Sequence, residues 1–91
     1  MSDVDRFQDG RWDAGRDAVV IAGRPEVVVT RSALEGWAGR AVRPDDACEL
    51  VAAEADRFVR AARATPADDG TVTLTARILS SRSWEVEPHA D

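Results

Sequence analysis

The segment formed by residues 46–63, DACELVAAEADRFVRAAR, constrains the fold more than any other part of the chain. At 100° per residue its apolar side chains fall on one side of a helix and most of its charged side chains on the other. The pattern predicts one amphipathic helix of about five turns. Asp46 and Glu49 have the spacing of a capping box, and Pro44 precedes them, where it does not interrupt the helix. Glu54 projects at the edge of the apolar side, so it must either reach past the rim to water or meet a cation from the facing layer.

Two short apolar runs predict a β-hairpin. Residues 18–22 (AVVIA) and 26–30 (EVVVT) are rich in β-branched side chains and are joined by Gly23, Arg24 and Pro25. Because both runs are apolar at nearly every position, we expect a central or doubly covered hairpin.

A short helix is predicted to follow the hairpin and to end near Gly39. Ser32 and Glu35 have capping-box spacing, and the apolar residues after them recur at helical intervals. Gly36 inside this helix lowers the helix stability by up to about 1 kcal/mol relative to Ala. We therefore expect it to serve another purpose, namely a close approach by another backbone.

The chain after the long helix predicts one more strand and leaves a further one open. Residues 71–79 alternate, with Val72 and Leu74 on the apolar side. Residues 84–87 (WEVE) alternate again. They form a separate strand if residues 80–83 turn the chain, and otherwise prolong the same strand past a bulge.

These elements predict an α+β fold of two layers. A three- or four-stranded antiparallel sheet packs against one long and one short helix in the order β-β-α-α-β, with an optional last strand. Residues 1–17 show neither helical nor strand periodicity and are expected to form an extended arm. Residues 18–87 are expected to form a single domain, and residues 88–91 a disordered tail that includes His89, the one histidine.

Composition limits the class of protein. Ninety-one residues give one domain with a small core, which gains stability from a partner subunit. The net charge of −5 disfavours binding to a phosphate backbone. No apolar run reaches the roughly 18 residues of a membrane span, and the first residues lack a signal-peptide pattern. We therefore expect a cytoplasmic protein that does not bind membranes.

Three side-chain groups are candidates for chemistry. Cys48 lies in the first turn of the long helix, where a helix dipole activates a thiol, but it falls among acids on the apolar side and favours an inert packed thiol over a nucleophile. The helical arginines Arg57, Arg60 and Arg63 form either a solvated face or a stripe for RNA or another polyanion. The adjacent acids, Asp45 with Asp46 and Asp68 with Asp69, are explained by a helix cap and a turn. We therefore expect no metal site and no cofactor.

Trp84 is the candidate for an interface. An edge strand that exposes a Trp favours contact with a second copy of the chain, and the alternative is packing of Trp84 onto its own core.

The first third of the chain resembles a known family. An aromatic residue, a Trp-Asp pair, an Arg and an Ala-Val strand precede the hairpin, a capped helix, a helical Arg and a last strand. In this pattern the chain resembles the small bacterial domain-of-unknown-function family 1488, mainly over residues 7–34. The residues that carry the resemblance are Phe7, Trp12, Asp13, Arg16, Ala18, Val19, residues 29–34, Arg57 and residues 72–74. Ser32 stands where the family has an acidic residue, and Ala53 where it has an aromatic. The resemblance implies the two-layer fold and no activity.

The recurring charged residues suggest a binding site. Asp13 or Glu54 is placed to accept a guanidinium fork from Arg16 or Arg57, which orients the chain. The functional alternative is a surface pocket formed with Trp12 for an acidic small molecule or a peptide terminus. The leading hypothesis from the sequence is thus a small non-catalytic binding or protein-interaction module, with a protein partner or itself as a homodimer. The alternatives are an RNA- or polyanion-binding regulator and a thiol-dependent enzyme centred on Cys48.

Overall fold

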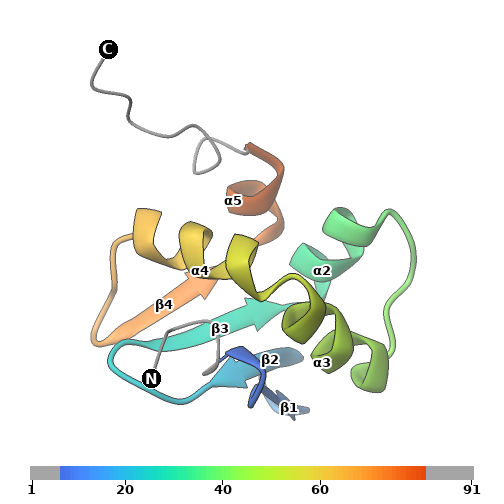
Figure 1. Ribbon diagram of the computed structural model, residues 1–91, viewed down its shortest axis with the longest axis horizontal. Helices are drawn as coiled ribbons and strands as arrows, with labels where there is room; N and C mark the ends of the chain where they lie inside the picture. The colour runs from blue at the N-terminus through green and yellow to red at the C-terminus, as the bar shows by residue number, and fades with distance from the viewer. Residues whose placement is uncertain (1–6, 82–91) are drawn as a thin grey trace.

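The predicted hairpin forms the centre of a four-stranded sheet. In the computed structural model, which describes residues 7–81, β2 (Ala18–Ile21) and β3 (Glu26–Thr30) pair antiparallel with Val19 opposite Val29. β1 (Arg11–Asp13) adds to β2 antiparallel, and β4 (Thr71–Leu74) adds to β3. The order across the sheet is β1-β2-β3-β4 (Figure 1).

The prediction of an antiparallel sheet is wrong, because β4 runs parallel to β3 with Val27 opposite Val72. Three helices lie between these strands in the chain: α2 (Arg31–Ala38), α3 (Pro44–Ala53) and α4 (Ala55–Ala64). Such a helical crossover returns the chain to the end of the sheet where β3 began, as parallel pairing requires. The fold is therefore a compact α+β domain with a mixed sheet.

The prediction of one long helix is also wrong, because the helix breaks at Glu54. This residue has φ −109° and ψ 29°, outside the helical region, and it separates α3 from α4. Its N–H still donates to the Leu50 carbonyl at 3.0 Å, and its carbonyl accepts from the Phe58 N–H at 3.1 Å. The break lets α3 contact β1 and β2 while α4 contacts β4.

Neither predicted capping box forms, and only α2 has another side-chain cap. Thr30, the last residue of β3, caps α2 because its Oγ1 accepts the Ala33 N–H at 3.1 Å. The Glu35 carboxylate accepts the Val42 N–H at 3.1 Å instead of bonding back to the start of the helix. At α3 the N-cap is Arg43 and Pro44 is the first helical residue, so Pro44 lies inside the helix.

The strand predicted for residues 71–79 is correct only for its first half. Val72 and Leu74 are buried as the alternation predicts, but β4 ends at Leu74 and α5 (Ala76–Ser81) follows. The strand stops because its partner β3 ends at Thr30, where α2 begins. In α5, Leu79 is buried at 1% exposure.

The N-terminal arm contributes a strand that the sequence pattern did not reveal, namely β1. The connection from β2 to β3 contains a cis peptide bond between Arg24 and Pro25. The strand expected at residues 84–87, the interface residue Trp84 and the tail lie outside the described residues.

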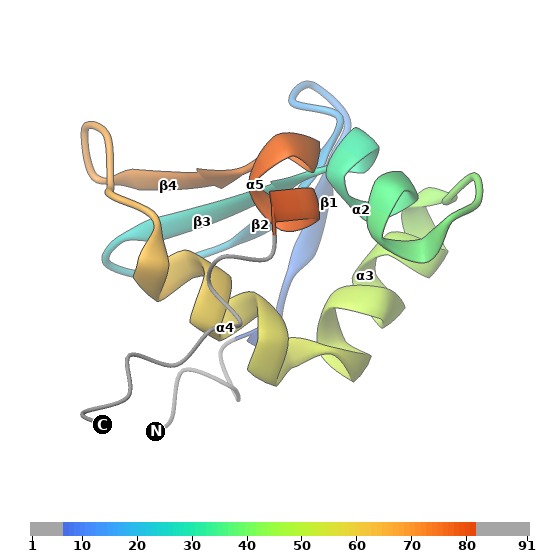
Figure 2. The ribbon, with the colours of Figure 1, turned by 90° about the horizontal axis from the view of Figure 1, so that it is seen from above.

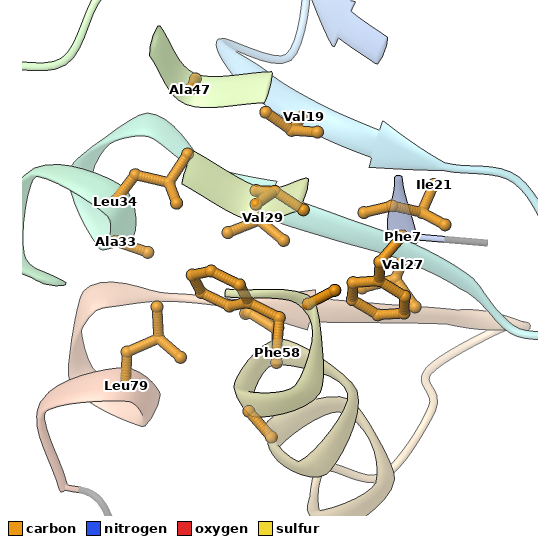
Figure 3. Packing of buried hydrophobic residues seen from close by; sticks show 14 of the residues in the cluster. Phe7, Val19, Ile21, Val27, Val29, Ala33, Leu34, Ala47, Phe58 and Leu79 are labelled. Atoms are coloured by element: carbon orange, nitrogen blue, oxygen red, sulfur yellow. The ribbon is translucent and has the colours of Figure 1, made fainter. Parts of the chain in front are cut away.

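All the buried helix residues join one core cluster on a single side of the sheet. Figure 2 shows α3 and α4 together on that side, with α2 and α5 near the ends of β3 and β4. Figure 3 shows Phe58 pointing from α4 toward Val29 of the sheet and Leu79 of α5. Val51 and Phe58 are both fully buried, so the predicted apolar side of residues 46–63 does face the sheet.

Candidate functional site

The outer face of the sheet is the first candidate surface. Along each strand side chains alternate between the two faces, and Val19, Val27, Val29, Val72 and Leu74 belong to the core cluster. Val20 and Val28, which are paired in the register, therefore point to the other face. Neither belongs to the core cluster, and the buried residues of α2 to α5 all lie on the opposite side. Within residues 7–81, this face is thus without a helical cover.

Arg16 crosses this outer face. Its Nη1 donates to Glu26 Oε1 at 2.9 Å, and its Nε lies 3.6 Å from Asp13 Oδ2. Asp13 is in register with Ala18 and Thr30 at one end of the sheet, whereas Glu26 begins β3 at the other. Glu26 and Thr30 are separated by roughly 13 Å along the strand at its usual rise.

A guanidinium that touches both carboxylates must lie above the middle of the strand. Val28, halfway between Glu26 and Thr30, is only 6% exposed although no described helix lies over it. In general, a long Arg side chain covers apolar surface with its aliphatic stem while its charge stays at the rim.

Two carboxylates around one guanidinium set the electrostatics of this network. The hydrogen bond from Arg16 to Glu26, the charge of Glu26 and the charge of Asp13 together raise the Arg16 pKa. The three side chains are between 34% and 50% exposed, so solvent screens these pairs and each contributes little to folding. The network holds the Arg16 side chain in place more than it stabilises the protein.

Asp13 also shapes the turn from which Arg16 projects. Its Oδ1 accepts the Gly15 N–H at 2.9 Å and the Arg16 N–H at 3.2 Å. These local bonds are typical of an Asp that begins a turn. An open hollow of about 560 Å³ follows β1 beside this turn and is lined by Asp9, residues 11–15, Val20 and Ala22.

The remaining predicted site residues form a second group on the helical side. Arg57 Nε lies 3.3 Å from Glu54 Oε2, so the cation that Glu54 meets comes from its own helical layer and not from the facing layer as expected. The Arg57 guanidinium also lies 5.9 Å from the ring centre of Trp37, whose ring is 5.5 Å from that of Phe58. This arrangement ties α2 to α4 next to the break in the helix.

The five predicted binding residues therefore do not form one pocket. Asp13 and Arg16 lie at the outer face, whereas Glu54 and Arg57 lie on the other side of the sheet. Trp12 lies opposite Val19 in β1 and packs against the core, although it also borders the hollow along this edge strand. Sequence reasoning found both local pairs and missed Glu26 and Trp37, whose contacts depend on the tertiary fold.

A third feature is a small apolar hollow between α4 and the connection from β2 to β3. It has a volume of about 110 Å³ and is lined by Phe7, Arg24, Pro25, Val27, Val59, Ala62 and Arg63. None of these residues is acidic, and two are arginines. Three of the lining residues, Phe7, Val27 and Val59, are at most 5% exposed.

The other candidates for chemistry are placed as follows. Cys48 is a free, half-buried thiol in α3 that packs against the core. In residues 7–81, no three His, Cys, Asp or Glu side chains are grouped to hold a metal ion. Arg57, Arg60 and Arg63 are exposed on α4, and the polyanion-binding alternative stays a prediction.

No helix in the described part of the chain is long and apolar enough to cross a membrane.

Comparison with known proteins matches the chain to no family model, no curated protein and no solved structure. The resemblance to family 1488 accordingly stays a prediction.

Proposed function

We propose that the protein is a small non-catalytic interaction module that pairs with a second copy of itself through the outer face of its sheet. The observation that supports this proposal is Val20, an apolar side chain at the centre of a face that no described helix covers. A sheet packs stably when its apolar positions are covered by a second layer. A second subunit supplies that layer, and a domain this small has little other apolar bulk to offer.

Charge favours a second copy as the partner. The chain has a net charge of −5, so two copies repel each other over most of their surface. The outer face is an exception, because its two arginines, Arg11 and Arg16, balance the carboxylates of Asp13 and Glu26. Two such faces approach without net repulsion, and each offers both partners of an ion pair.

The size of the face indicates weak pairing. Four strands of about four residues cover roughly 19 by 13 Å at the usual spacings. This is far below the roughly 800 Å² per partner of a standard interface. The edges add little, because β1 has three residues and the Thr71 backbone on the outer edge of β4 is bonded to Asp68. We therefore expect a dimer that forms in the high micromolar range.

Sedimentation velocity from micromolar to millimolar protein tests this proposal. We expect a concentration-dependent dimer for the unchanged protein and a monomer for Val20→Lys, which adds a cation to the face. Thr73→Lys, at an exposed position in the same row, should have the same effect and guards against misfolding of the first variant. Ala53→Lys adds the same charge at the exposed end of α3 and should still dimerise.

A protein that stays monomeric at millimolar concentration, or equal weakening by Ala53→Lys, would overturn the proposal. In the first case the face is left for a different partner, and in the second the dimer depends on general charge and not on this surface.

A further inference from the structure

We infer that Arg11 of one subunit binds Asp9 of the partner subunit, so that two equal ion pairs join the proposed dimer. This inference rests on the proposed pairing of the outer faces and names the charges that orient one face on the other. Both residues line the open hollow that follows β1. Each subunit thus contributes a residue to the site of the other.

Asp9 and Arg11 are the charges of this hollow that have no partner in the described part of the chain. Both residues are exposed, and within residues 7–81 neither side chain forms a hydrogen bond or an ion pair. The third charged residue of the hollow, Asp13, is already engaged, because its carboxylate accepts two N–H groups of the following turn and lies beside Arg16. One anion and one cation are therefore left for a second molecule.

These two charges lie where the outer face meets the edge of the sheet. Arg11 is in register with Val20, and the next residue, Trp12, packs against the core, so Arg11 is directed to the outer face. A Cβ on Gly10 would meet core side chains of β2, so the backbone between Asp9 and Arg11 faces inward. β1 is an edge strand of the sheet (Figure 1). Asp9 and Arg11 consequently border the surface on which the second copy is proposed to lie.

A patch that carries both signs of charge is complementary to a rotated copy of itself. In a two-fold dimer, every contact from one residue to another is repeated in the opposite direction. The contact between Arg11 and Asp9 therefore forms twice, once on each side of the axis. A guanidinium binds a carboxylate through two parallel N–H donors, which gives the pair a defined orientation. Contacts between small β-branched side chains have little direction, so the ion pairs fix the register of the two faces.

Sedimentation velocity of charge-reversed variants tests the inference at concentrations at which the unchanged protein dimerises. Arg11→Glu and Asp9→Arg should each weaken the dimer by about tenfold, because each replaces two attractive contacts with two repulsive ones. An equimolar mixture of the two variants should dimerise as the unchanged protein does, since one pair keeps its signs and the other has them exchanged. Arg11→Gln adds no acid to β1, should weaken the dimer to a smaller extent, and guards against a folding defect in Arg11→Glu.

The sign of the Asp9→Arg effect separates the ion pair from general repulsion. The chain has a net charge of −5, and this variant makes it less negative, so general repulsion alone would give a tighter dimer. Loss of the ion pair gives a weaker one. Glu49→Arg makes the same charge change at an exposed position of α3, on the other side of the sheet, and should not weaken the dimer.

A dimer of Asp9→Arg that is as tight as that of the unchanged protein, or a mixture of the two variants that stays monomeric, would contradict the inference. If Val20→Lys still prevents dimerisation in that case, the outer face remains the interface and only the assignment of its ion pairs is lost. If the unchanged protein stays monomeric at millimolar concentration, the proposed function fails and the ion pairs fail with it.

Discussion

At the scale of single residues, Gly10 shows how tightly the N-terminal segment packs on the sheet. A Cβ at this position would lie 2.9 Å from Val19 Cγ1 and 3.4 Å from Ile21 Cγ1. Val19 and Ile21 are both fully buried, so neither side chain has space to move away from an added methyl group. We predict that Gly10→Ala lowers the free energy of unfolding by about 1–3 kcal/mol, the usual cost of overpacking, as measured by urea denaturation.

Gly36→Ala is the matched control for this prediction, since it adds the same methyl group. A Cβ at Gly36 would be 4.0 Å from its nearest neighbour, Ala76 Cβ, and the residue lies inside α2. The Gly36→Ala change should raise the free energy of unfolding by about 0.5–1 kcal/mol, because Ala has the higher helix propensity. A neutral Gly10→Ala would contradict the close contact with Val19, whatever the control does.

The residues of the candidate site show what local sequence reveals. Asp13 with Arg16 and Glu54 with Arg57 are three residues apart, so turn and helix geometry alone bring each pair together. Glu26 is ten residues from Arg16 and reaches it only because β1, β2 and β3 form one sheet. The hollow with Arg24 and Arg63 joins a loop to a distant helix, and no spacing in the sequence reveals it.

At the scale of elements, the start of α2 differs between the sequence pattern, which predicts Ser32 as the cap, and the structure, in which Thr30 is the cap. Thr30 Oγ1 accepts the Ala33 N–H and donates to the Leu74 carbonyl at 3.4 Å, so one hydroxyl joins β3, α2 and β4. We predict that Thr30→Ala lowers the free energy of unfolding by about 0.5–2 kcal/mol, as loss of an N-cap does. Ser32→Ala, at the cap that the sequence pattern predicted, should change it by less than about 0.5 kcal/mol because Ser32 is exposed.

Urea denaturation of both variants measures the difference. A larger loss for Ser32→Ala than for Thr30→Ala would mean that the helix begins at the predicted cap, two residues later.

The elements that the sequence predicted correctly have strong local signals. The β-branched runs specify β2 and β3, and the Gly39 that ends α2 has a left-handed φ of 72°. The break at Glu54 has no such signal, since residues 52–55 contain neither Pro nor Gly. The direction of β4 depends on the crossover, and β1 is too short to show a period. These features are set by packing against the sheet and not by local preference.

At the scale of the whole molecule, one core joins every layer. Phe58 of α4 is fully buried, its ring contacts Trp37 of α2, and it points toward Val29 of the sheet and Leu79 of α5 (Figure 3). A domain of this size has a stability at the low end of the usual range of about 5–15 kcal/mol, so the loss of one such side chain takes most of it.

We predict that Phe58→Ala lowers the free energy of unfolding by about 3–5 kcal/mol and leaves a large unfolded fraction at room temperature. Phe58→Leu keeps most of the volume and should cost about 1–2 kcal/mol. Leu50→Ala, at a half-buried position on α3, is the control and should cost less than Phe58→Ala. Far-UV circular dichroism and tryptophan fluorescence during urea denaturation should give one shared transition, because Trp37 lies against Phe58 in the same core. Two separate transitions, or a Phe58→Ala protein as stable as the unchanged one, would mean that the helices and the sheet do not fold around a common centre.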